Sequence, residues 1–216
     1  MKKKALIVGA SKITAKDFLK GKDFDIIVAA DGGYRYCLEE KREPDILIGD
    51  FDTLDTSLIR SPKSIKKLNP IKDDTDTFFA VKLLLEKGYD EIHLLGCLGG
   101  KIEHTLGNIQ ILSYLKDRNI QGYLYSEDAS QVVFMLENDS IHFKKNVKGM
   151  VSVFSYTPKC ENVSIFNMKY NLDHAELTSS IPLGVSNEFL LDRKETGLIT
   201  TEKGRLLIIA PTESVF

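Results

Sequence analysis

The first half of the chain alternates between strand-like and helix-like segments, and this alternation restricts the possible folds more than any other feature. Short apolar runs predict buried strands at residues 5–8, 26–30, 46–48, 65–68, 91–95 and 122–125. Helical patterns are predicted between them, at about 14–20, 34–41, 56–60, 75–87 and 103–116. Strands that alternate with helices assemble into a mostly parallel sheet covered by helices, so we expect a doubly wound α/β domain.

The pattern changes after about Ser126. Short runs rich in Val, Ile, Phe and Tyr are separated by Gly, Pro, Asn and Lys, at residues 132–136, 141–143, 150–156, 163–166, 198–200 and 206–209. This pattern is typical of an all-β domain. We therefore predict an α/β domain over residues 1–130 and a smaller all-β sandwich or barrel over residues 131–216.

Composition restricts the function. The net charge of −2, from 29 basic and 31 acidic residues, argues against a protein that binds nucleic acid or a membrane surface, since both need a basic excess. No apolar run approaches the ~20 residues that cross a bilayer. The three cysteines (Cys37, Cys97 and Cys160) have neither the spacing of a zinc site nor the even number of a disulfide framework. We expect a cytoplasmic protein whose partners are small molecules.

Four junctions between a predicted strand and the following loop carry small or acidic residues. The carboxyl ends of the strands in a doubly wound sheet open onto one crevice, so these motifs are expected to form one site. The first junction is Asp31-Gly32-Gly33. Its glycines let backbone N–H groups approach a phosphate, while Asp31 binds a ribose hydroxyl or positions a turn. Taken alone, the motif is explained equally well as a tight turn.

The second junction places Asp50 and Asp52 after the apolar residues 46–48. Residues two apart in an extended segment point the same way, so the two carboxylates repel each other unless a cation lies between them. Mg²⁺ is the usual cation for hard carboxylate oxygens. A solvated acidic turn is the alternative, because turns favour Asp on conformational grounds.

The third junction spans Lys72 to Asp76 and leads into the clearest helix of the chain. Capping of the helix N-terminus explains Asp74, Thr75 and Asp76 without any ligand. It does not explain Lys72. A cation beside a helix N-terminus and near metal-binding carboxylates suits a polyphosphate that Mg²⁺ also bridges.

The fourth junction combines Gly99 and Gly100 with Lys101, Glu103 and His104. The glycines again permit close backbone approach, and Lys101 supplies positive charge. His104 is interpreted either as a site residue or as a buried histidine satisfied by hydrogen bonds.

In the β half, residues 184–189 concentrate polar groups before two leucines. Ser186 and Asn187 offer a hydroxyl and an amide, and Phe189 or Tyr170 offers an aromatic face, which together suit a small heterocycle. A turn that leads into a strand is the alternative.

In this order the strings resemble the thiamine pyrophosphokinase family. Its members carry A-D-G-G, P-D-x-x-x-G-D-F-D-[ST], a segment similar to K-D-x-T-D, then G-G-R-x-D-H and, late in the chain, G-x-S-N-E. The strings here are ADGG at 30–33, PDILIGDFDT at 44–53, KDDTD at 72–76, GGKIEHTLGN at 99–108 and GVSNEF at 184–189. Each motif is weak by itself, but their order and spacing match over nearly the whole chain.

The resemblance implies an enzyme that transfers the pyrophosphoryl group of ATP to the hydroxyl of thiamine, releasing AMP and thiamine diphosphate. It implies Mg²⁺ held by Asp50, Asp52 and Asp76, and a homodimer with nucleotide in the α/β domain and thiamine in the β domain. The residues expected to act on the phosphates are Asp50, Asp52, Lys72, Thr75, Asp76, Lys101 and Glu103. The other residues expected to bind the nucleotide are Asp31, Gly32, Gly33, Gly99, Gly100 and His104. Those expected to hold thiamine are Ser186, Asn187 and Phe189.

Two residues depart from the family pattern: Lys101 replaces the usual Arg and Glu103 the usual Asp. Lys lacks the guanidinium fork, so its grip on a phosphate differs. The chain also has no Trp to place against the substrate. Three alternatives stay open: a pyrophosphokinase that acts on another hydroxymethyl heterocycle such as a pterin, a non-catalytic module that binds nucleotide or thiamine, and a Mg²⁺-dependent phosphohydrolase.

Overall fold

The computed structural model describes residues 2–20, 22–49, 64–67, 74–191 and 195–216. The chain divides into two compact units, residues 1–129 and residues 130–216. The first contains parallel strands and helices, and the second consists mainly of antiparallel strands. An α/β unit followed by an all-β unit is the organisation that the sequence predicts in general terms.

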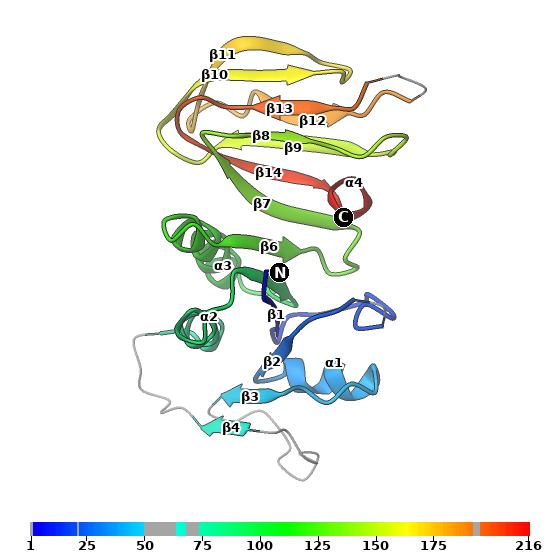
Figure 1. The fold of residues 1–216 in the computed structure, drawn as a ribbon, viewed down its shortest axis with the longest axis vertical. Coiled ribbons are helices and arrows are strands. Elements are labelled where there is room, and N and C mark those ends of the chain that lie inside the picture. The colour runs from blue at the N-terminus through cyan, green and yellow to red at the C-terminus, as the bar shows by residue number, and fades with distance from the viewer. Residues whose placement is uncertain (1, 21, 50–63, 68–73, 192–194) are drawn as a thin grey trace. The chain divides into compact units, whose positions relative to one another are not determined.

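The α/β unit is built on parallel strands in the order β6-β5-β1-β2-β3-β4 (Figure 1). The strands are β1 (Lys4–Val8), β2 (Ile26–Ala30), β3 (Ile46–Gly49), β4 (Ser64–Lys67), β5 (Glu91–Leu95) and β6 (Gln121–Tyr125). Every residue of β2, β3 and β5 is buried. Strands buried on both faces read as continuous apolar runs, which is why the sequence located β2 and β3.

Helices cover both faces of this sheet (Figure 1). Helix α1 (Gly33–Glu39) lies on one side, and α2 (Asp76–Glu86) and α3 (Ile102–Lys116) lie on the other. The chain runs outward from β1 to β4 and then returns to β5 on the other side of β1, so the strand order reverses between β1 and β5. Ligands of open α/β sheets bind at such a reversal, beyond the carboxyl ends of the strands.

One predicted helix is wrong. Residues 14–20 form bends and turns instead of a helix. The N–H groups of Thr14 and Ala15 donate to the carbonyl of Glu127, at 2.8 and 3.2 Å, and Asp17 has a positive φ of 57°. The backbone N–H groups of Thr14 and Ala15 are therefore hydrogen-bonded to a residue outside the segment. The short helix predicted near 56–60 lies outside the described residues.

The β unit consists of two antiparallel sheets, with the strand orders β12-β9-β14-β7 and β11-β10-β13-β8. The first sheet contains β7 (Gln131–Glu137), β9 (Met150–Ser155), β12 (Gly184–Glu188) and β14 (Arg205–Pro211). The second contains β8 (Ser140–His142), β10 (Lys159–Phe166), β11 (Leu172–Thr178) and β13 (Leu198–Thr200). A short helix, α4 (Thr212–Val215), follows β14.

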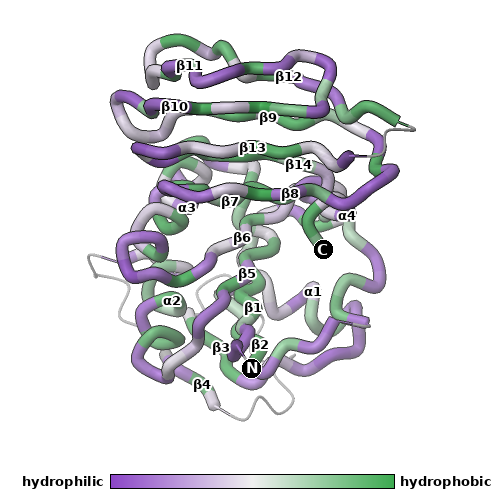
Figure 2. Tube along the Cα trace, turned by 45° about the horizontal axis from the view of Figure 1, so that its top comes forward, coloured by the Kyte–Doolittle hydropathy of each residue, from purple (hydrophilic) through white to green (hydrophobic). Residues whose placement is uncertain are grey.

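Two strands of the β unit, β11 and β12, were not predicted as strands from the sequence, whereas β9 was. In β9, alternate residues are buried, which gives the sequence its strand signal. β11 lies at the edge of its sheet, and only Leu177 of its residues is buried, so it lacks that signal. The contrast in hydropathy between β9 and β11 can be followed in Figure 2. β12 occupies residues that the sequence allowed as a turn.

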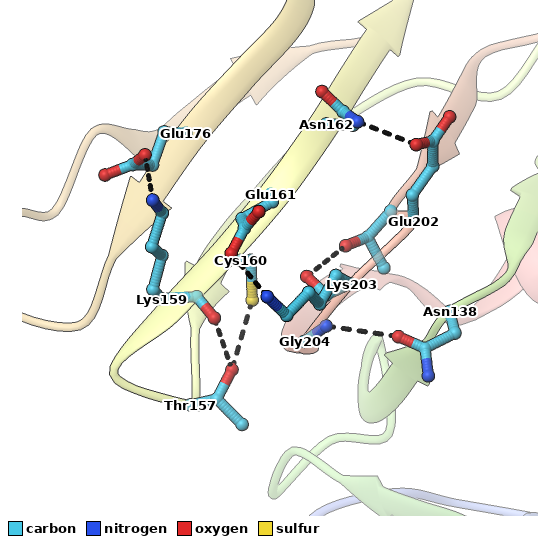
Figure 3. A network of polar contacts seen from close by, with 11 residues as sticks. Asn138, Thr157, Lys159, Cys160, Glu161, Asn162, Glu176, Glu202, Lys203 and Gly204 are labelled. Carbon is cyan, nitrogen blue, oxygen red and sulfur yellow. Dashed lines mark hydrogen bonds and ion pairs between the residues drawn. The ribbon is translucent and has the colours of Figure 1, made fainter.

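Polar contacts join the turns of the β unit (Figure 3). Lys203 Nζ lies 2.8 Å from Glu161 Oε1, and Asn162 Nδ2 donates to Glu202 Oε2 at 2.7 Å. Exposed contacts of this kind each contribute little to stability, so their main effect is to fix the path of the chain between strands.

The thiols of Cys37, Cys97 and Cys160 are buried. Within the part of the chain that the structure describes, no helix is long and apolar enough to span a membrane.

Candidate active site

A crevice of about 180 Å³ lies where the strand order reverses. Its lining comes from the end of β2, from the segments that follow β1, β2 and β5, from the start of α2 and from the N-terminal half of α3. The lining residues are Ala10, Ser11, Ala30, Asp31, Thr75, Asp76, Thr77, Gly96, His104 and Asn108. Four residues predicted from the sequence therefore share one crevice: Asp31, Thr75, Asp76 and His104.

Close packing at the strand ends shapes this crevice. A Cβ at Gly9 would lie 2.5 Å from the carbonyl oxygen of Gly96, and a Cβ at Gly33 would lie 2.0 Å from that of Val8. Real Cβ atoms do not approach so closely, so both positions require glycine. Gly33 thus has a packing role at the start of α1. Gly32 lines an adjoining cavity of about 170 Å³, together with Ser11 and Arg35.

Asp31 is held tightly at the end of β2. Its backbone has a positive φ of 45°, and its N–H donates to the carbonyl of Ile48 at 2.8 Å. Its carboxylate lies directly against Gly49, the last described residue before Asp50. The predicted residues Asp50, Asp52 and Lys72 lie outside the described residues. Among the residues that are described, no group of three or more His, Cys, Asp or Glu is arranged to hold a metal ion.

Thr75 is the N-cap of α2, and its Oγ1 accepts a hydrogen bond from the Phe78 N–H at 3.2 Å. Asp76 is the acidic residue of the first turn. The predicted start of this helix is therefore confirmed, because capping depends on side chains a few residues apart. Since Thr75 Oγ1 is an acceptor in the cap, its O–H remains able to donate into the crevice that it lines.

The loop before α3 contains two glycines with positive φ, 79° at Gly99 and 69° at Gly100. Its shape is fixed by a hydrogen bond from the Gly99 N–H to Thr105 Oγ1 at 3.1 Å. Lys101 is the N-cap residue of α3 but makes no side-chain capping bond. Exposed Glu103 and His104 form the first turn. The exposure of His104 excludes its alternative interpretation as a buried histidine.

Asn108 is a site residue that the sequence reasoning missed. Its side chain lies in the α3 face that packs on the sheet, with 7% exposure, and its Nδ2 donates to the carbonyl of Cys97 at 2.7 Å. The amide therefore ties α3 to the loop after β5. The available signal was an Asn one helical turn before the buried Ile111 and Leu112, where a core-facing position is normally apolar. Ser11 and Thr77, which also line the crevice, carry no comparable signal.

A larger cavity of about 420 Å³ lies between α2 and α3 and adjoins the crevice. We call it the α2–α3 groove. It shares Thr75, Thr77, His104 and Asn108 with the crevice. Its other lining residues are Phe78, Glu103, Gly107, Gln110, Ile111 and Tyr114. The two spaces are thus contiguous, with a polar end at the strand termini and an aromatic end further along the helices.

In the β unit, Asn187 is buried and its amide is bonded to backbone. Its Oδ1 accepts from the N–H groups of Tyr170 (3.0 Å) and Glu188 (2.9 Å), and its Nδ2 donates to the carbonyl of Tyr170 at 2.6 Å. Ser186 is exposed, with φ at 58°. Phe189 packs edge-on against Phe143, with 5.1 Å between ring centroids. Asn187 and Phe189 therefore hold β12 and its end in place, while Tyr170, at 60% exposure, presents its ring to the outside.

These features define a class: a two-domain protein with a parallel α/β unit, whose ligand crevice lies at the strand reversal, followed by an antiparallel β unit. A family model described as the thiamin pyrophosphokinase catalytic domain matches residues 19–124. A second, described as the thiamin pyrophosphokinase vitamin B1 binding domain, matches residues 138–206. The chain belongs to the thiamin pyrophosphokinase family, as the resemblance of its motifs predicted.

Individual relatives agree with this assignment. The chain is 28% identical over 193 residues to a thiamine pyrophosphokinase of Bacillus subtilis, covering 86% of this chain and 87% of the relative. It is also similar to the crystal structure of thiamine pyrophosphokinase from Bacillus subtilis, with a TM-score of 0.83, 25% identity and coverage of 97% and 99% of the two chains. Yeast thiamin pyrophosphokinase shares the fold, with a TM-score of 0.77 at 18% identity and coverage of 99% of this chain and 88% of the yeast chain.

Proposed function

We propose that this protein transfers the pyrophosphoryl group of ATP to the hydroxyl of thiamine, giving thiamine diphosphate and AMP. The observation that carries the proposal is the crevice at the strand reversal, which places the Asp31 and Asp76 carboxylates, the Thr75 hydroxyl and His104 around one space. The matches to a catalytic and a vitamin B1 binding domain support the same reaction.

In this reaction the hydroxyl oxygen of thiamine forms a bond to the β-phosphorus of ATP. The bond from that phosphorus to the oxygen bridging the α-phosphate breaks, and AMP leaves with the bridging oxygen. The hydroxyl proton passes to a base, for which Glu103 or one of the aspartates is proposed. Thr75 donates a hydrogen bond to a phosphate oxygen, and Lys72 and Lys101 neutralise the negative charge that moves during transfer.

The chemistry of the described donors fits a magnesium ion. Asp31 and Asp76 line the crevice with carboxylate oxygens, the ligands that Mg²⁺ prefers. We propose Asp50, Asp52 and Asp76 as its ligands. When bound, Mg²⁺ supplies charge neutralisation on the triphosphate. The surplus of carboxylates also favours the cationic thiazolium ring of thiamine.

The β unit is proposed to hold thiamine through Ser186, Asn187 and Phe189, in β12 and directly after it. The exposed hydroxyl of Ser186 is available to a ligand, whereas the amide of Asn187 is bonded to the backbone of Tyr170 and holds β12 against that residue. We further propose a doubly wound α/β domain over residues 1–130, a β sandwich over residues 131–216, a homodimer and a cytoplasmic location. The domain bounds rest on the pattern of strands and helices, the location on the composition, and the homodimer on the family resemblance.

One assay tests the function and separates it from its rivals. The protein is incubated with ATP, Mg²⁺ and thiamine, and AMP and thiamine diphosphate are quantified. Equal amounts of both products are expected. AMP formed only with a pterin acceptor would identify the other pyrophosphokinase, and binding without AMP would identify a non-catalytic module. Phosphate release without an acceptor would identify a phosphohydrolase.

A further inference from the structure

We infer that Thr105 is a positioning residue for the reaction: its hydroxyl fixes the loop before α3 and so sets the point from which Lys101 reaches the phosphates. The inference rests on the proposed function for one element, the neutralisation of phosphate charge by Lys101. Thr105 itself lines neither the crevice nor the α2–α3 groove. Its effect on the reaction is therefore exerted through the loop.

The loop between β5 and α3 contains two residues that give its backbone unusual freedom. Gly99 and Gly100 both have positive φ, and a Cβ at Gly99 would meet nothing within 4 Å. Packing around this position therefore does not hold it in place, and glycine has the widest choice of backbone conformations of all residues. The loop keeps a single shape only where hydrogen bonds impose one.

Thr105 supplies these hydrogen bonds from the N-terminal part of α3. The Gly99 N–H donates to Thr105 Oγ1 at 3.1 Å, which is an ordinary length, and the Thr105 hydroxyl donates to the Gly99 carbonyl at 3.3 Å. The Thr105 N–H donates to the carbonyl of Lys101 at 3.2 Å. One residue thus holds the chain on both sides of Gly100, and it fixes the backbone from which the Lys101 side chain starts.

Two further side chains attach this loop to the crevice. Asn108, one helical turn after Thr105, donates to the carbonyl of Cys97 at 2.7 Å. Ser11 Oγ donates to the carbonyl of Gly99 in a longer bond of 3.4 Å. Asn108 and Ser11 both line the crevice. The loop that Thr105 shapes is therefore tied to the wall of the site.

Lys101 needs a fixed starting point because its own side chain is exposed and makes no capping bond to α3. A lysine side chain loses rotamer freedom when it meets a phosphate, and a small displacement of a charged group lowers the rate of transfer steeply. A backbone fixed in advance leaves only the side chain to be ordered. Because the negative charge moves during transfer, we expect the hydroxyl of Thr105 to affect kcat more than KM.

Thr105→Val tests the hydroxyl directly. Valine has a helix propensity similar to that of threonine, so the exchange removes the two side-chain bonds to Gly99 and leaves α3 in place. We expect kcat for thiamine diphosphate formation to fall at least about 10-fold, with the KM for ATP changed less than about 3-fold. Thr105→Ser keeps the hydroxyl and is the matched control, so its kcat should stay within about 3-fold of the wild-type value.

A double-mutant cycle with Lys101→Ala tests whether Thr105 acts through Lys101. Two residues that work through the same contact have non-additive effects. Thr105→Val should therefore change kcat by less than about 2-fold when Lys101 is already alanine. The affinity for inorganic tripolyphosphate with Mg²⁺, measured by calorimetry, should show the same non-additivity without depending on turnover.

Gly99→Ala disturbs the same loop without changing α3, and it carries the test if Thr105→Val does not fold. The φ of 79° disfavours a residue with a Cβ, although there is room for one. Gly88→Ala is the matched control, since Gly88 follows α2 with a φ of 75° and equally open surroundings. Both variants should lose similar stability in urea, but only Gly99→Ala should lower kcat, and only while Lys101 is present.

Two results would overturn the inference. A Thr105→Val protein with the wild-type kcat would show that the hydroxyl has no part in the reaction. A loss of the same size with and without Lys101 would show that Thr105 does not act through Lys101. The proposed function fails separately: a wild type that makes no thiamine diphosphate, but whose tripolyphosphate affinity shows the non-additive pair, would refute the reaction and support the role of Thr105.

Discussion

The carboxylate of Asp31 occupies the space in which a side chain at Gly49 would lie. A Cβ at position 49 would come within 1.8 Å of Asp31 Oδ1, far inside any real contact distance. The Asp31 N–H also donates to the carbonyl of Ile48 at 2.8 Å. The glycine that precedes Asp50 therefore has a role inside the protein: it leaves room for the carboxylate that lines the crevice.

We predict that Gly49→Ala displaces Asp31 and lowers both activity and stability. The rate of thiamine diphosphate formation should fall at least about 10-fold, and the free energy of unfolding by about 1–3 kcal/mol, the usual cost of overpacking. Initial rates and urea unfolding measure the two effects. The double variant Gly49→Ala/Asp31→Ala is the control, since it should recover stability without recovering activity. A fully active and stable Gly49→Ala protein would contradict the described contact.

Substitution of the proposed metal ligands should abolish turnover with little change in stability. Asp50→Asn, Asp52→Asn and Asp76→Asn should each reduce the rate at least ~100-fold, the scale of losing a major electrostatic contact in a transfer site. Rates measured across a Mg²⁺ titration check this, and higher Mg²⁺ should restore part of the loss. Rates near the wild-type value for all three variants would exclude their metal role.

Asn108 should contribute to stability through one hydrogen bond. Asn108→Ala leaves the buried carbonyl of Cys97 without this donor and should cost about 1–2 kcal/mol. Asn108→Asp should cost more, about 2–3 kcal/mol, because it turns a carboxylate toward that carbonyl oxygen. Urea unfolding at neutral pH gives the order of the two variants. An Asp variant as stable as the wild type would show that the side chain does not face Cys97.

The sequence located features that depend on near neighbours. Thr75 and Asp76 were expected at a helix start because capping involves residues only three apart, and the structure has the cap there. Buried strands such as β2 were found because continuous apolar runs are needed on a sheet covered on both faces.

What the sequence could not predict depends on distant partners. Residues 14–20 have a helical pattern, but the N–H groups of Thr14 and Ala15 donate to Glu127, more than a hundred positions away, and Asp17 has a positive φ. The same limit applies to Asn108, whose role is visible only once α3 packs beside Cys97. Strand β11 buries only Leu177, so no apolar alternation marks it.

The buried His93 should make the protein less stable in acid. Its Nδ1 lies 2.8 Å from the Tyr125 hydroxyl and its Nε2 lies 2.9 Å from Glu91 Oε1, which suits a neutral ring that accepts from Tyr125 and donates to Glu91. Burial lowers the pKa of His93, outweighing the hydrogen bond to Glu91 that raises it. The hydrogen bond from His93 lowers the pKa of Glu91, and nearby Lys4 lowers it further.

The sign of the pH effect follows from these directions. The unfolded chain protonates His93 at its ordinary pKa of 6.5 while the folded protein does not, so stability is lost as the pH falls below that value. Glu91 adds a further loss below its ordinary pKa of 4.5. Urea unfolding at several pH values from about 8 to 5 should show the decline, and His93→Gln should flatten it. The same slope in both proteins would assign the effect to other groups.

The stability of the β unit should depend on the ion pair formed by Arg205 and Glu137. These residues face each other in the register of β14 and β7, and Arg205 Nη2 lies 3.0 and 2.9 Å from the two carboxylate oxygens. Arg205 is 7% exposed, so Glu137→Ala removes this partner from a buried cation and should cost about 2–4 kcal/mol, discounted for the partial exposure of Glu137. The double variant Arg205→Met/Glu137→Met should lose less than Glu137→Ala, because it removes the buried positive charge together with the negative one. Urea unfolding of the wild type, the single variant and the double variant measures these differences in stability. A Glu137→Ala protein as stable as the wild type would mean that the pair contributes nothing.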